Sequence, residues 1–150
     1  MPPNGLTWDD IAIEAAWIDY NGHLNMAAYL VIFDRAMDRL IGAVGLSASP
    51  GTDPTLFAAS AKIDYRREVA RDERPSCVTG VIALDDKRLH TWQELRVAGE
   101  ARARAENLHI HVDRIGPRAA PFAPDLRGRL EGMVGPAPDW VGRPVAHRLG

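Results

Sequence analysis

The alternation of apolar and polar side chains predicts a strand, a loop and a long helix in the first third of the chain. Across residues 8–17, apolar side chains recur at every second position, which is typical of a strand with one buried face. Residues 18–24 break this period and are expected to form a loop. Asn25 then occupies the position of a helix N-cap, because its side chain can accept a hydrogen bond from the free backbone N–H groups of a first helical turn. We therefore expect a helix to begin directly after Asn25.

The expected helix is apolar around most of its circumference. Its polar positions form one narrow stripe, made of Asp34, Arg35, Asp38 and Arg39. A helix with so little polar surface is surrounded by other parts of the protein on most sides. Gly45 is placed to end the helix in a left-handed cap, and residues 47–54 have the composition of a surface loop.

The second half of the chain predicts short strands in series. Runs of strand length occur at residues 57–65, 76–84, 89–97 and about 101–112. Residues 85–88 and 98–100 have turn composition, so neighbouring strands should pair as an antiparallel meander. Such a meander and a helix with a broad apolar surface are both buried when the helix lies across the concave face of a curved antiparallel sheet. The sequence therefore predicts an α+β protein with the hotdog fold, in which a curved antiparallel sheet wraps around one long helix.

The end of the chain differs in composition from the rest. Prolines become frequent after Ile115, and one short helix is expected at residues 125–133. We expect a single domain over residues 1–150, with its core at about residues 8–115. Residues 116–150 are expected to form a peripheral proline-rich tail that could also cover a sheet edge.

Composition and charge narrow the class of function. The chain of 150 residues, with 46% hydrophobic and 25% charged residues, suits one globular domain. A formal net charge of −2 without a Lys/Arg cluster argues against a nucleic-acid partner. The N-terminus has no basic-then-apolar leader and no apolar run reaches the length of a membrane span, so we expect a cytoplasmic protein without a membrane partner. Cys77, the single cysteine, excludes an internal disulfide and is expected to be a buried, unreactive thiol.

Reactive side chains are densest at the junction of the first expected strand and the helix. This segment holds Asp19, Tyr20, Asn21, Gly22, His23 and Asn25. Glycine lets the backbone approach a ligand closely, and the start of a helix offers unpaired N–H groups at the positive end of its dipole. A carboxylate beside such amides can attack an activated carbonyl such as a thioester, or activate a water that does so, while the amides stabilise the oxyanion. From spacing alone an alternative is equally good, in which Asp19 and Asn21 only shape a turn and Asn25 only caps the helix.

The residues of this junction resemble a known family. The pattern Asp-x-x-Gly-His-x-Asn at residues 19–25, with Tyr29 and Phe33-Asp34-Arg35-Ala36 beyond it, is similar to the signature of the 4-hydroxybenzoyl-CoA thioesterase group of hotdog enzymes. Residues 63–69, 84–90 and 108–113 resemble segments of the betainyl-CoA thioesterases of carnitine breakdown, and the resemblance covers roughly residues 8–115. It implies hydrolysis of a short acyl-CoA, with betainyl-CoA as the favoured substrate and an aromatic acyl-CoA such as 4-hydroxybenzoyl-CoA as the alternative.

The same resemblance implies roles for individual residues. Asp19 would be the nucleophile or the general base, and the backbone amide near Met26 would donate to the oxyanion. His23 would position a water or the thioester carbonyl, or serve as a structural group, and Asn25 completes the motif. Some families of this fold carry the catalytic carboxylate on the central helix, which makes Asp34 the second candidate. Its position in the polar stripe favours a solvated or subunit-facing role.

Substrate contacts follow from the chemistry of the implied substrate. A trimethylammonium group cannot be hydrogen-bonded and favours aromatic faces, for which the candidates are Trp17, Tyr20, Tyr29, Tyr65 and Trp92. The phosphates of CoA favour cations, for which the candidates are Lys87, Arg88, Arg66 and Arg67. Core packing for the aromatic residues and surface solvation for the cations are the alternatives.

Other chemistries fit the sequence less well. His109 and His111 share one strand face, but no third ligand accompanies them at a suggestive spacing, so we expect no metal and no other cofactor. Ser60 and Ser76 lack the Gly-x-Ser-x-Gly elbow of serine hydrolases. An enoyl-CoA hydratase of this fold would have a proline after the asparagine at the position of Asn21, and a non-catalytic acyl-CoA-binding protein is the remaining alternative.

Quaternary structure is expected to complete the site. A single layer of this fold leaves one sheet edge unpaired and the candidate site half exposed. We therefore expect a homodimer or homotetramer whose sheets join edge to edge, with the sites between subunits.

Overall fold

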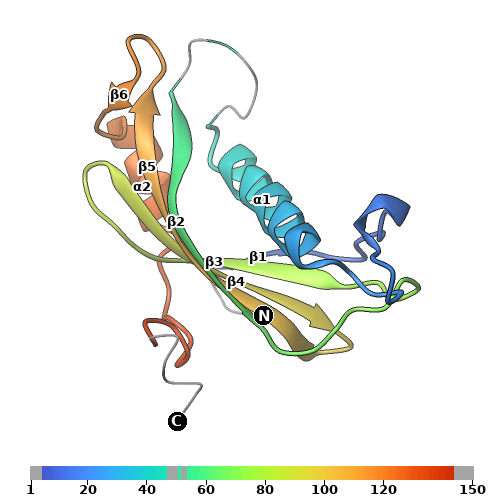
Figure 1. Ribbon diagram of the computed structural model, residues 1–150. Coiled ribbons are helices and arrows are strands. Elements are labelled where there is room, and N and C mark those ends of the chain that lie inside the picture. The colour runs from blue at the N-terminus through green and yellow to red at the C-terminus, as the bar shows by residue number, and fades with distance from the viewer. Residues whose placement is uncertain (1–4, 47–50, 52–53, 144–150) are drawn as a thin grey trace.

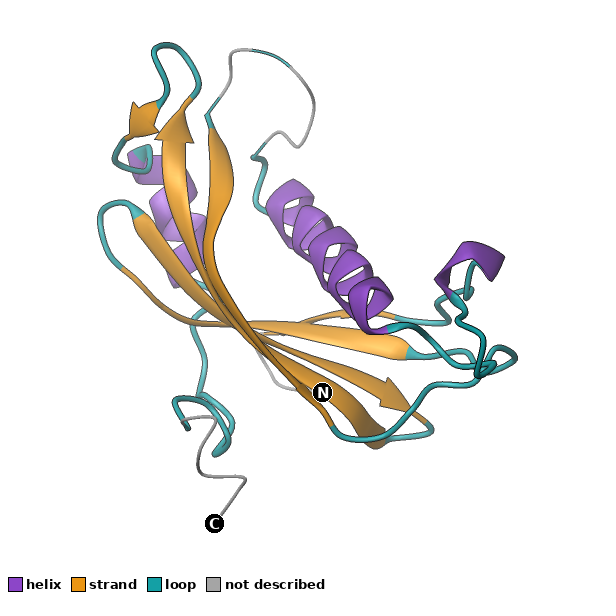
Figure 2. Cartoon of the chain, viewed as in Figure 1, coloured by secondary structure: helices purple, strands orange, loops and turns teal. Residues whose placement is uncertain are grey.

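The protein is a curved antiparallel sheet with one long helix against its concave face (Figures 1 and 2). The computed structural model describes residues 5–46, 51 and 54–143. In chain order the elements are β1 (Gly5–Trp8), a 3-10 turn (Ala15–Trp17), α1 (Met26–Ala43), β2 (Thr55–Tyr65), β3 (Ser76–Leu84), β4 (Arg88–Val97), β5 (Glu100–Asp113), β6 (Arg118–Ala119) and α2 (Pro124–Glu131). The strands follow the order β1-β3-β4-β5-β2, and β6 pairs with the end of β5. The predicted hotdog arrangement is confirmed.

The meander is confirmed for β3, β4 and β5, but the predicted pairing of β2 with β3 is wrong. Consecutive strands β3, β4 and β5 pair antiparallel, with the two-residue turn at Ala98 and Gly99 in the left-handed conformation that hairpins favour. β2 pairs with β5 and not with its sequence neighbour β3, because β1 already occupies the free edge of β3. The connector of residues 66–75 carries the chain from β2, at one edge of the sheet, to β3, which lies next to the edge strand β1 on the other side.

The strand expected at residues 8–17 is wrong. The strand is β1, which ends at Trp8, and the chain then leaves the sheet through Asp10, whose φ of 53° is incompatible with a strand. Arg74 holds the Asp10 carboxylate at 2.8 Å, and the Ile11 N–H donates to the Pro75 carbonyl at 2.8 Å. Ile11 and Trp17 still point into the core, so the two-residue period reports burial of alternate side chains in an extended segment without strand pairing.

Both predicted caps of α1 are confirmed. Asn25 Oδ1 accepts a hydrogen bond from the Ala28 N–H at 2.9 Å. At the other end, Gly45 has a φ of 82° and its N–H donates to the Gly42 carbonyl at 3.1 Å, while the Leu46 N–H reaches the Ile41 carbonyl at 3.0 Å. This pair of bonds satisfies the last carbonyl groups of the helix and requires a left-handed residue at position 45.

The core forms two clusters between α1 and the inward positions of the strands. The first half of α1 packs with Val69, Cys77 and Leu95, and the second half packs with Val81 and Leu89. The predicted buried thiol is confirmed, and burial raises the pKa of Cys77 to about 12. No helix in the described residues is long and apolar enough to cross a membrane.

The described part of the tail contributes to the core and covers an edge. Residues Phe122, Leu126 and Leu130 are buried in the cluster at the C-terminal end of α1, because β1 shields only part of β3 and leaves this end open. Val134 then bridges to Val81 along the uncovered edge of β3, and the Gly135 N–H donates to the Val81 carbonyl at 3.1 Å. The described part of the tail is therefore part of the core and not peripheral, contrary to expectation. That the tail could cover a sheet edge was expected.

Replacing Gly80 by Ala is expected to destabilise the sheet by about 1–3 kcal/mol, because the added methyl group overpacks a filled site. Gly80 lies opposite Trp92 in the β3–β4 ladder, and a Cβ atom there would be 2.2 Å from the Trp92 Nε1 atom. The matched control is Gly42→Ala, since a Cβ at Gly42 meets nothing within 4 Å. Chemical denaturation should show the loss for Gly80→Ala and none for the control; equal midpoints would contradict this packing.

Candidate active site

The junction between the 3-10 turn and α1 is a tight loop, called here the motif loop (residues 19–25). The Asp19 N–H donates to the His23 carbonyl at 2.9 Å, and the Gly22 N–H donates to the Asp19 carbonyl at 3.0 Å. Gly22 has a φ of 78°, a conformation that side chains other than glycine rarely adopt. The chain therefore reverses within a few residues and presents the Asp19 side chain close to the start of α1.

One oxygen of the Asp19 carboxylate is anchored and the other is available. Oδ1 accepts from the Asn21 N–H at 2.8 Å and, more weakly, from the His23 N–H at 3.4 Å. Among the described residues, no group donates to Oδ2. The turn-shaping role that spacing left open is thus real, but it uses one oxygen only. A carboxylate fixed in this way is oriented before a substrate arrives.

The first turn of α1 offers two free donors beside this carboxylate. The Ala28 N–H is taken by Asn25, but the N–H groups of Met26 and Ala27 have no acceptor within the described part of the chain. The Tyr65 hydroxyl donates to the Met26 carbonyl at 3.0 Å and fixes the position of this turn. Two free amides at the positive end of a helix dipole can stabilise negative charge on a carbonyl oxygen.

The connector of residues 66–75 supports the motif loop. The Leu24 N–H donates to the Val69 carbonyl at 2.8 Å, and His23 forms a bridge with Ala70. Arg102 fastens the connector to β5, since its guanidinium donates to the Glu68 carbonyl at 2.6 Å and to both Glu73 oxygens at 3.0 and 2.9 Å.

The charge of the buried arginine also affects its partner. The Arg102 side chain is only 9% exposed. Its hydrogen bonds hold the pKa of Glu73 below the usual value. The motif loop therefore rests on a segment that is fixed by an ion pair.

The five aromatic candidates do not come together. Tyr29 and Tyr65 meet edge to face, with ring centroids 5.1 Å apart, next to the start of α1. Trp17 is buried beneath Arg35, and Tyr20 is 97% exposed. Trp92 lies on the helix-free face of the sheet, where its ring contacts Trp140 with centroids 6.1 Å apart. Of the five candidates, only Tyr29 and Tyr65 form a ring contact with each other, although Tyr20 belongs to the motif loop and Trp17 lies two residues before it.

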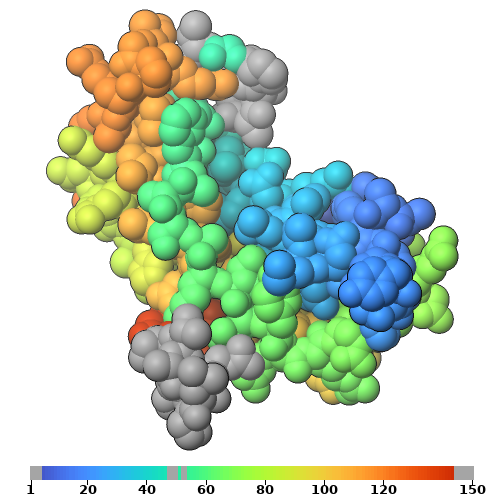
Figure 3. Space-filling model, viewed as in Figure 1, coloured from blue at the N-terminus to red at the C-terminus, as the bar shows by residue number. Residues whose placement is uncertain are grey.

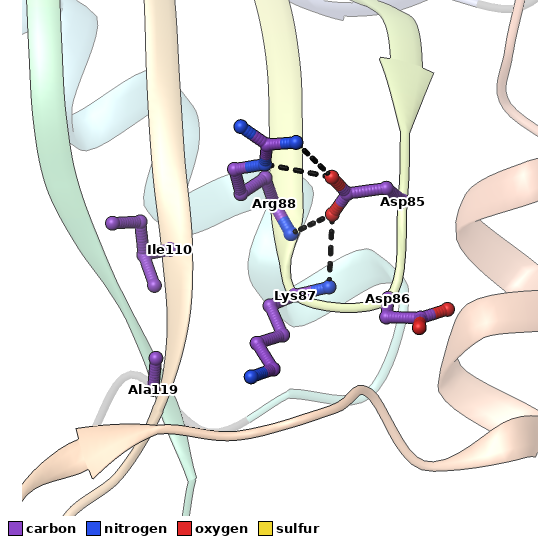
Figure 4. Close-up of a pocket in the computed structure, with 6 residues that line it drawn as sticks. All are labelled: Asp85, Asp86, Lys87, Arg88, Ile110 and Ala119. Carbon is purple, nitrogen blue, oxygen red and sulfur yellow. Dashed lines mark hydrogen bonds and ion pairs between the residues drawn. The ribbon is translucent and has the colours of Figure 1, made fainter.

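Two of the four cationic candidates lie far from the motif loop within the chain. Lys87 and Arg88 are in the β3–β4 turn, near the C-terminal end of α1, and line a cavity of about 440 Å³ (Figure 4). Asp85 accepts from the Arg88 guanidinium at 2.7 Å and from the backbone of the turn, which lowers the pKa of Asp85 to about 2. The Lys87 amino group points away from this pair (Figure 4).

The other two cations lie at the motif end. Both follow β2 directly, and the backbone N–H groups of Arg66 and Arg67 donate to the Arg102 carbonyl at 2.8 and 3.1 Å. Arg67 is paired with Glu100 at 3.0 Å. The Arg66 side chain is exposed and has no partner in the described residues. Of these two candidates, Arg66 is therefore the one that is available to a ligand.

A second group of polar side chains, which the sequence did not reveal as a unit, lies between α1 and the sheet. It lines a cavity of about 370 Å³ with contributions from Asp34, Gln93, Asn107 and His109. From the sequence, Asp34 was the second candidate for the catalytic carboxylate, with a solvated or subunit-facing role favoured, and His109 was considered only as a metal ligand. Polar residues at inward positions of β4 and β5 were the available signal, but their meeting with α1 depends on the tertiary structure.

The two histidines of β5 have different surroundings. His109 lines this cavity, whereas His111 Nδ1 lies 2.8 Å from the Ala120 carbonyl and its ring contacts Phe122. Within the described residues, no group of three or more His, Cys, Asp or Glu side chains could hold a metal ion.

Comparisons with known proteins agree with this geometry. The model of the thioesterase-like superfamily matches residues 13–130. A betainyl-CoA thioesterase of Pseudomonas aeruginosa is 33% identical over 93% of this chain and 94% of its own. A crystal structure of a thioesterase candidate from Pseudomonas putida KT2440 superposes with a TM-score of 0.79 at 34% identity, covering 93% of each chain.

A further structural neighbour shows the same fold at lower identity. It is a Staphylococcus aureus protein in complex with CoA, with a TM-score of 0.82 and 21% identity over 95% of this chain and 93% of its own. The family match spans the motif loop, α1 and the whole meander. The chain therefore belongs to the thioesterase-like superfamily of hotdog-fold thioester hydrolases.

Proposed function

We propose that the protein hydrolyses a short acyl-CoA thioester at the motif loop, with Asp19 as the catalytic carboxylate. The observation that carries this proposal is the anchored Asp19 carboxylate with a free Oδ2, beside the two free amides of Met26 and Ala27. A carbonyl oxygen at these amides would be polarised while Asp19 acts on the carbonyl carbon. If Asp19 only shaped the turn, as in the alternative interpretation, it would need only Oδ1, and Oδ2 would have no role.

The chemistry can follow two routes with the same groups. As a general base, Asp19 takes a proton from a water whose oxygen bonds to the thioester carbon, and the tetrahedral oxyanion rests on the Met26 and Ala27 amides. Collapse breaks the carbon–sulfur bond, and the thiolate of CoA takes up the proton. As a nucleophile, Asp19 would first form an anhydride and release the thiolate, and water would then hydrolyse the anhydride. His23 lies in the same loop and can position the water.

The favoured substrate is betainyl-CoA. Support comes from the 33% identity to a betainyl-CoA thioesterase over nearly the full length of both chains. An aromatic acyl-CoA such as 4-hydroxybenzoyl-CoA is the second candidate. Arg66, the unpaired one of the two candidate cations at the motif end, would contact a CoA phosphate. A cytoplasmic location stays a prediction of the sequence.

We further propose a homodimer that joins at β2 and the outer side of α1. β2 stands at the end of the strand order, and its outer edge has no partner strand in the described residues. Beside it, the outer side of α1 is uncovered (Figure 3) and exposes Met26, Leu30 and Val31, while β2 exposes Phe57. Such a combination of open edge and apolar surface is normally covered in solution.

The dimer is tested by Phe57→Glu, with Ile115→Glu as the control because Ile115 is also exposed but lies in the turn between β5 and β6, outside β2 and α1. Light scattering should give a dimer for the wild type and the control, and a smaller species for Phe57→Glu. A monomeric wild-type protein at micromolar concentration would contradict the dimer, and a dimeric Phe57→Glu would contradict its placement at β2.

The activity is tested by measuring thiol release from betainyl-CoA, 4-hydroxybenzoyl-CoA and linear acyl-CoAs. Hydrolysis of at least one short acyl-CoA is expected, with betainyl-CoA preferred. Hydration of an enoyl-CoA without thiol release would indicate a hydratase. Binding of every acyl-CoA without turnover would indicate a non-catalytic binding protein.

A further inference from the structure

The cavity between α1 and the sheet begins at the turn that carries the free amides. Its helical wall consists of Ala27, Leu30, Val31 and Asp34, together with Phe33 and Met37. Four of these residues follow the spacing of one helix face, so the cavity runs along α1 away from the motif loop. Ala27 and Asp34 are separated by about 10 Å along the helix axis, given the rise of about 1.5 Å per residue. A group bound through its carbonyl at the Ala27 amide would therefore extend towards Asp34.

The cavity has one charged side chain, and its charge is negative. Asp34 is its one carboxylate, and no lysine or arginine is among the residues that line it. His109, on the sheet side, is nine-tenths buried, and burial lowers the pKa of its imidazole, which is therefore neutral at neutral pH. The buried Nδ1 atom of His109 has no hydrogen-bond partner in the described residues. An unsatisfied buried polar atom at a cavity wall needs a partner, which a bound ligand or a water in the cavity can supply.

The amide groups on the sheet wall are held in one orientation. The Gln93 side-chain NH2 donates to the Phe33 carbonyl at 2.8 Å and to Thr79 Oγ1 at 3.1 Å. The Asn107 NH2 donates to Gln93 Oε1 at 2.9 Å. Since the donors of both amides are engaged, the atom that Asn107 has left to offer a ligand is its Oδ1 acceptor.

The neighbouring helical turn carries a second carboxylate, which does not line the cavity. Asp38 lies one turn beyond Asp34, and burial, with a smaller contribution from the Asp34 charge, raises the pKa of Asp38. The cavity thus combines a carboxylate, an acceptor oxygen and a neutral imidazole with apolar walls. A cation is attracted to such a site, whereas a second carboxylate is repelled.

We propose that this cavity holds the acyl group and that Asp34 selects acyl groups with a positive charge distal to the thioester carbonyl. The inference rests on the proposed thioesterase function and assigns its substrate class to a residue outside the motif loop. Asp34 acts here as a specificity determinant and not as the catalytic carboxylate. Acyl groups that end in a carboxylate are excluded by the same charge.

The test compares two substrates of equal shape and different charge. Trimethylammonioacetyl-CoA carries the cation, and 3,3-dimethylbutanoyl-CoA replaces its nitrogen by carbon. The wild type should prefer the cationic substrate by about tenfold in kcat/KM. Asp34→Asn should lose this preference by lowering the value for the cationic substrate, and leave the neutral substrate within about twofold. Asp38→Asn is the matched control, because Asp38 does not line the cavity, and should retain the preference.

The position of the charge is tested by chain length. With 4-trimethylammoniobutanoyl-CoA the cation lies closer to Asp34 than with the two-carbon acyl group. The loss for Asp34→Asn should therefore be larger with the longer substrate than with the shorter one. A loss that does not grow with length would contradict the direction in which the acyl group is placed.

Other outcomes separate the inference from the proposed function. Equal losses for the cationic and the neutral substrate in Asp34→Asn would mean a catalytic or structural role and would overturn the inference. If the wild type hydrolyses neither substrate, calorimetry can compare the affinities of two thioethers that are not turned over. These are the cationic S-(2-trimethylammonioethyl)-CoA and the neutral S-(3,3-dimethylbutyl)-CoA. A preference for the cationic thioether that is lost in Asp34→Asn would uphold the inference while hydrolysis fails, and equal affinities would refute it.

Discussion

Replacing Asp19 by Asn is expected to lower kcat/KM for acyl-CoA hydrolysis by at least about 10²-fold, because an amide can neither accept the proton of water nor attack the thioester. Asn retains an oxygen that can accept from the Asn21 N–H, which Oδ1 of Asp19 does at 2.8 Å. The motif loop should therefore keep its shape while the chemistry is lost. Steady-state release of free thiol measures the effect, and thermal unfolding checks that stability is unchanged.

The control for this change is Asp9→Asn. Asp9 is exposed, precedes the motif loop in the chain, and forms no side-chain contact within the described residues. Its replacement should leave kcat/KM within about twofold, as expected for a surface site without special contacts. If Asp19→Asn retained the activity of this control, the catalytic carboxylate would have to be sought elsewhere, with Asp34 as the next candidate.

Replacing Arg102 by Met is expected to destabilise the protein by about 1–3 kcal/mol, because the half-buried Glu73 carboxylate and the Glu68 carbonyl lose the donors of a buried guanidinium. The side chains of Arg102 and Glu73 are 9% and 26% exposed. The change also releases the Glu68 carbonyl, so the connector below the motif loop keeps its backbone bonds to β5 but loses the attachment made by the Arg102 side chain. Chemical denaturation should show the loss, and kcat should fall although the residue lies outside the motif loop.

The matched control is Arg127→Met. Arg127 also bridges two carboxylates, Asp86 and Glu131, but its side chain is 39% exposed and its partners are more exposed still. Exposed pairs of this kind contribute about 0–1 kcal/mol, so the control should be close to the wild type. Equal losses for the two variants would contradict the role assigned to the buried pair.

Local signals in the sequence were sufficient for α1. Asn25 and Gly45 bound the helix through hydrogen bonds to residues three to five positions away, so the sequence itself contains both partners. The Arg88 ion pair is equally local, since Asp85 lies in the same turn, although the sequence analysis considered Arg88 only as a cation for CoA. Predictions of this kind depend on short-range geometry.

The pairing of strands that are distant in the chain could not be predicted from the sequence. The alternation at residues 8–17 correctly indicated that Ile11 and Trp17 are buried, but burial on alternate sides does not require a neighbouring strand. In the same way, the choice of β5 as the partner of β2 depends on β1 occupying the edge of β3. Side-chain periodicity contains no information about either choice.

The two parts of the candidate site differ in how far they could be predicted, because one is local in the chain and the other is not. Asp19, His23, Asn25 and Met26 are neighbours in the chain, so a motif could point to them. The cavity that holds Asp34 and His109 is assembled from α1, β2, β4 and β5. Aromatic residues were the chemically reasonable candidates for a cationic acyl group, yet Trp17, Tyr20 and Trp92 lie in different places.

The most direct test of the central claim is a single-turnover experiment with the protein in excess over trimethylammonioacetyl-CoA. Because each acyl-CoA is already bound, the rate of thiol appearance reports the chemical step and not substrate capture. The wild type should convert the bound substrate completely, whereas Asp19→Asn should bind it with similar affinity and convert it at least about 10²-fold more slowly. Conversion at the wild-type rate by the Asp19→Asn protein would contradict the assignment of Asp19 as the catalytic carboxylate.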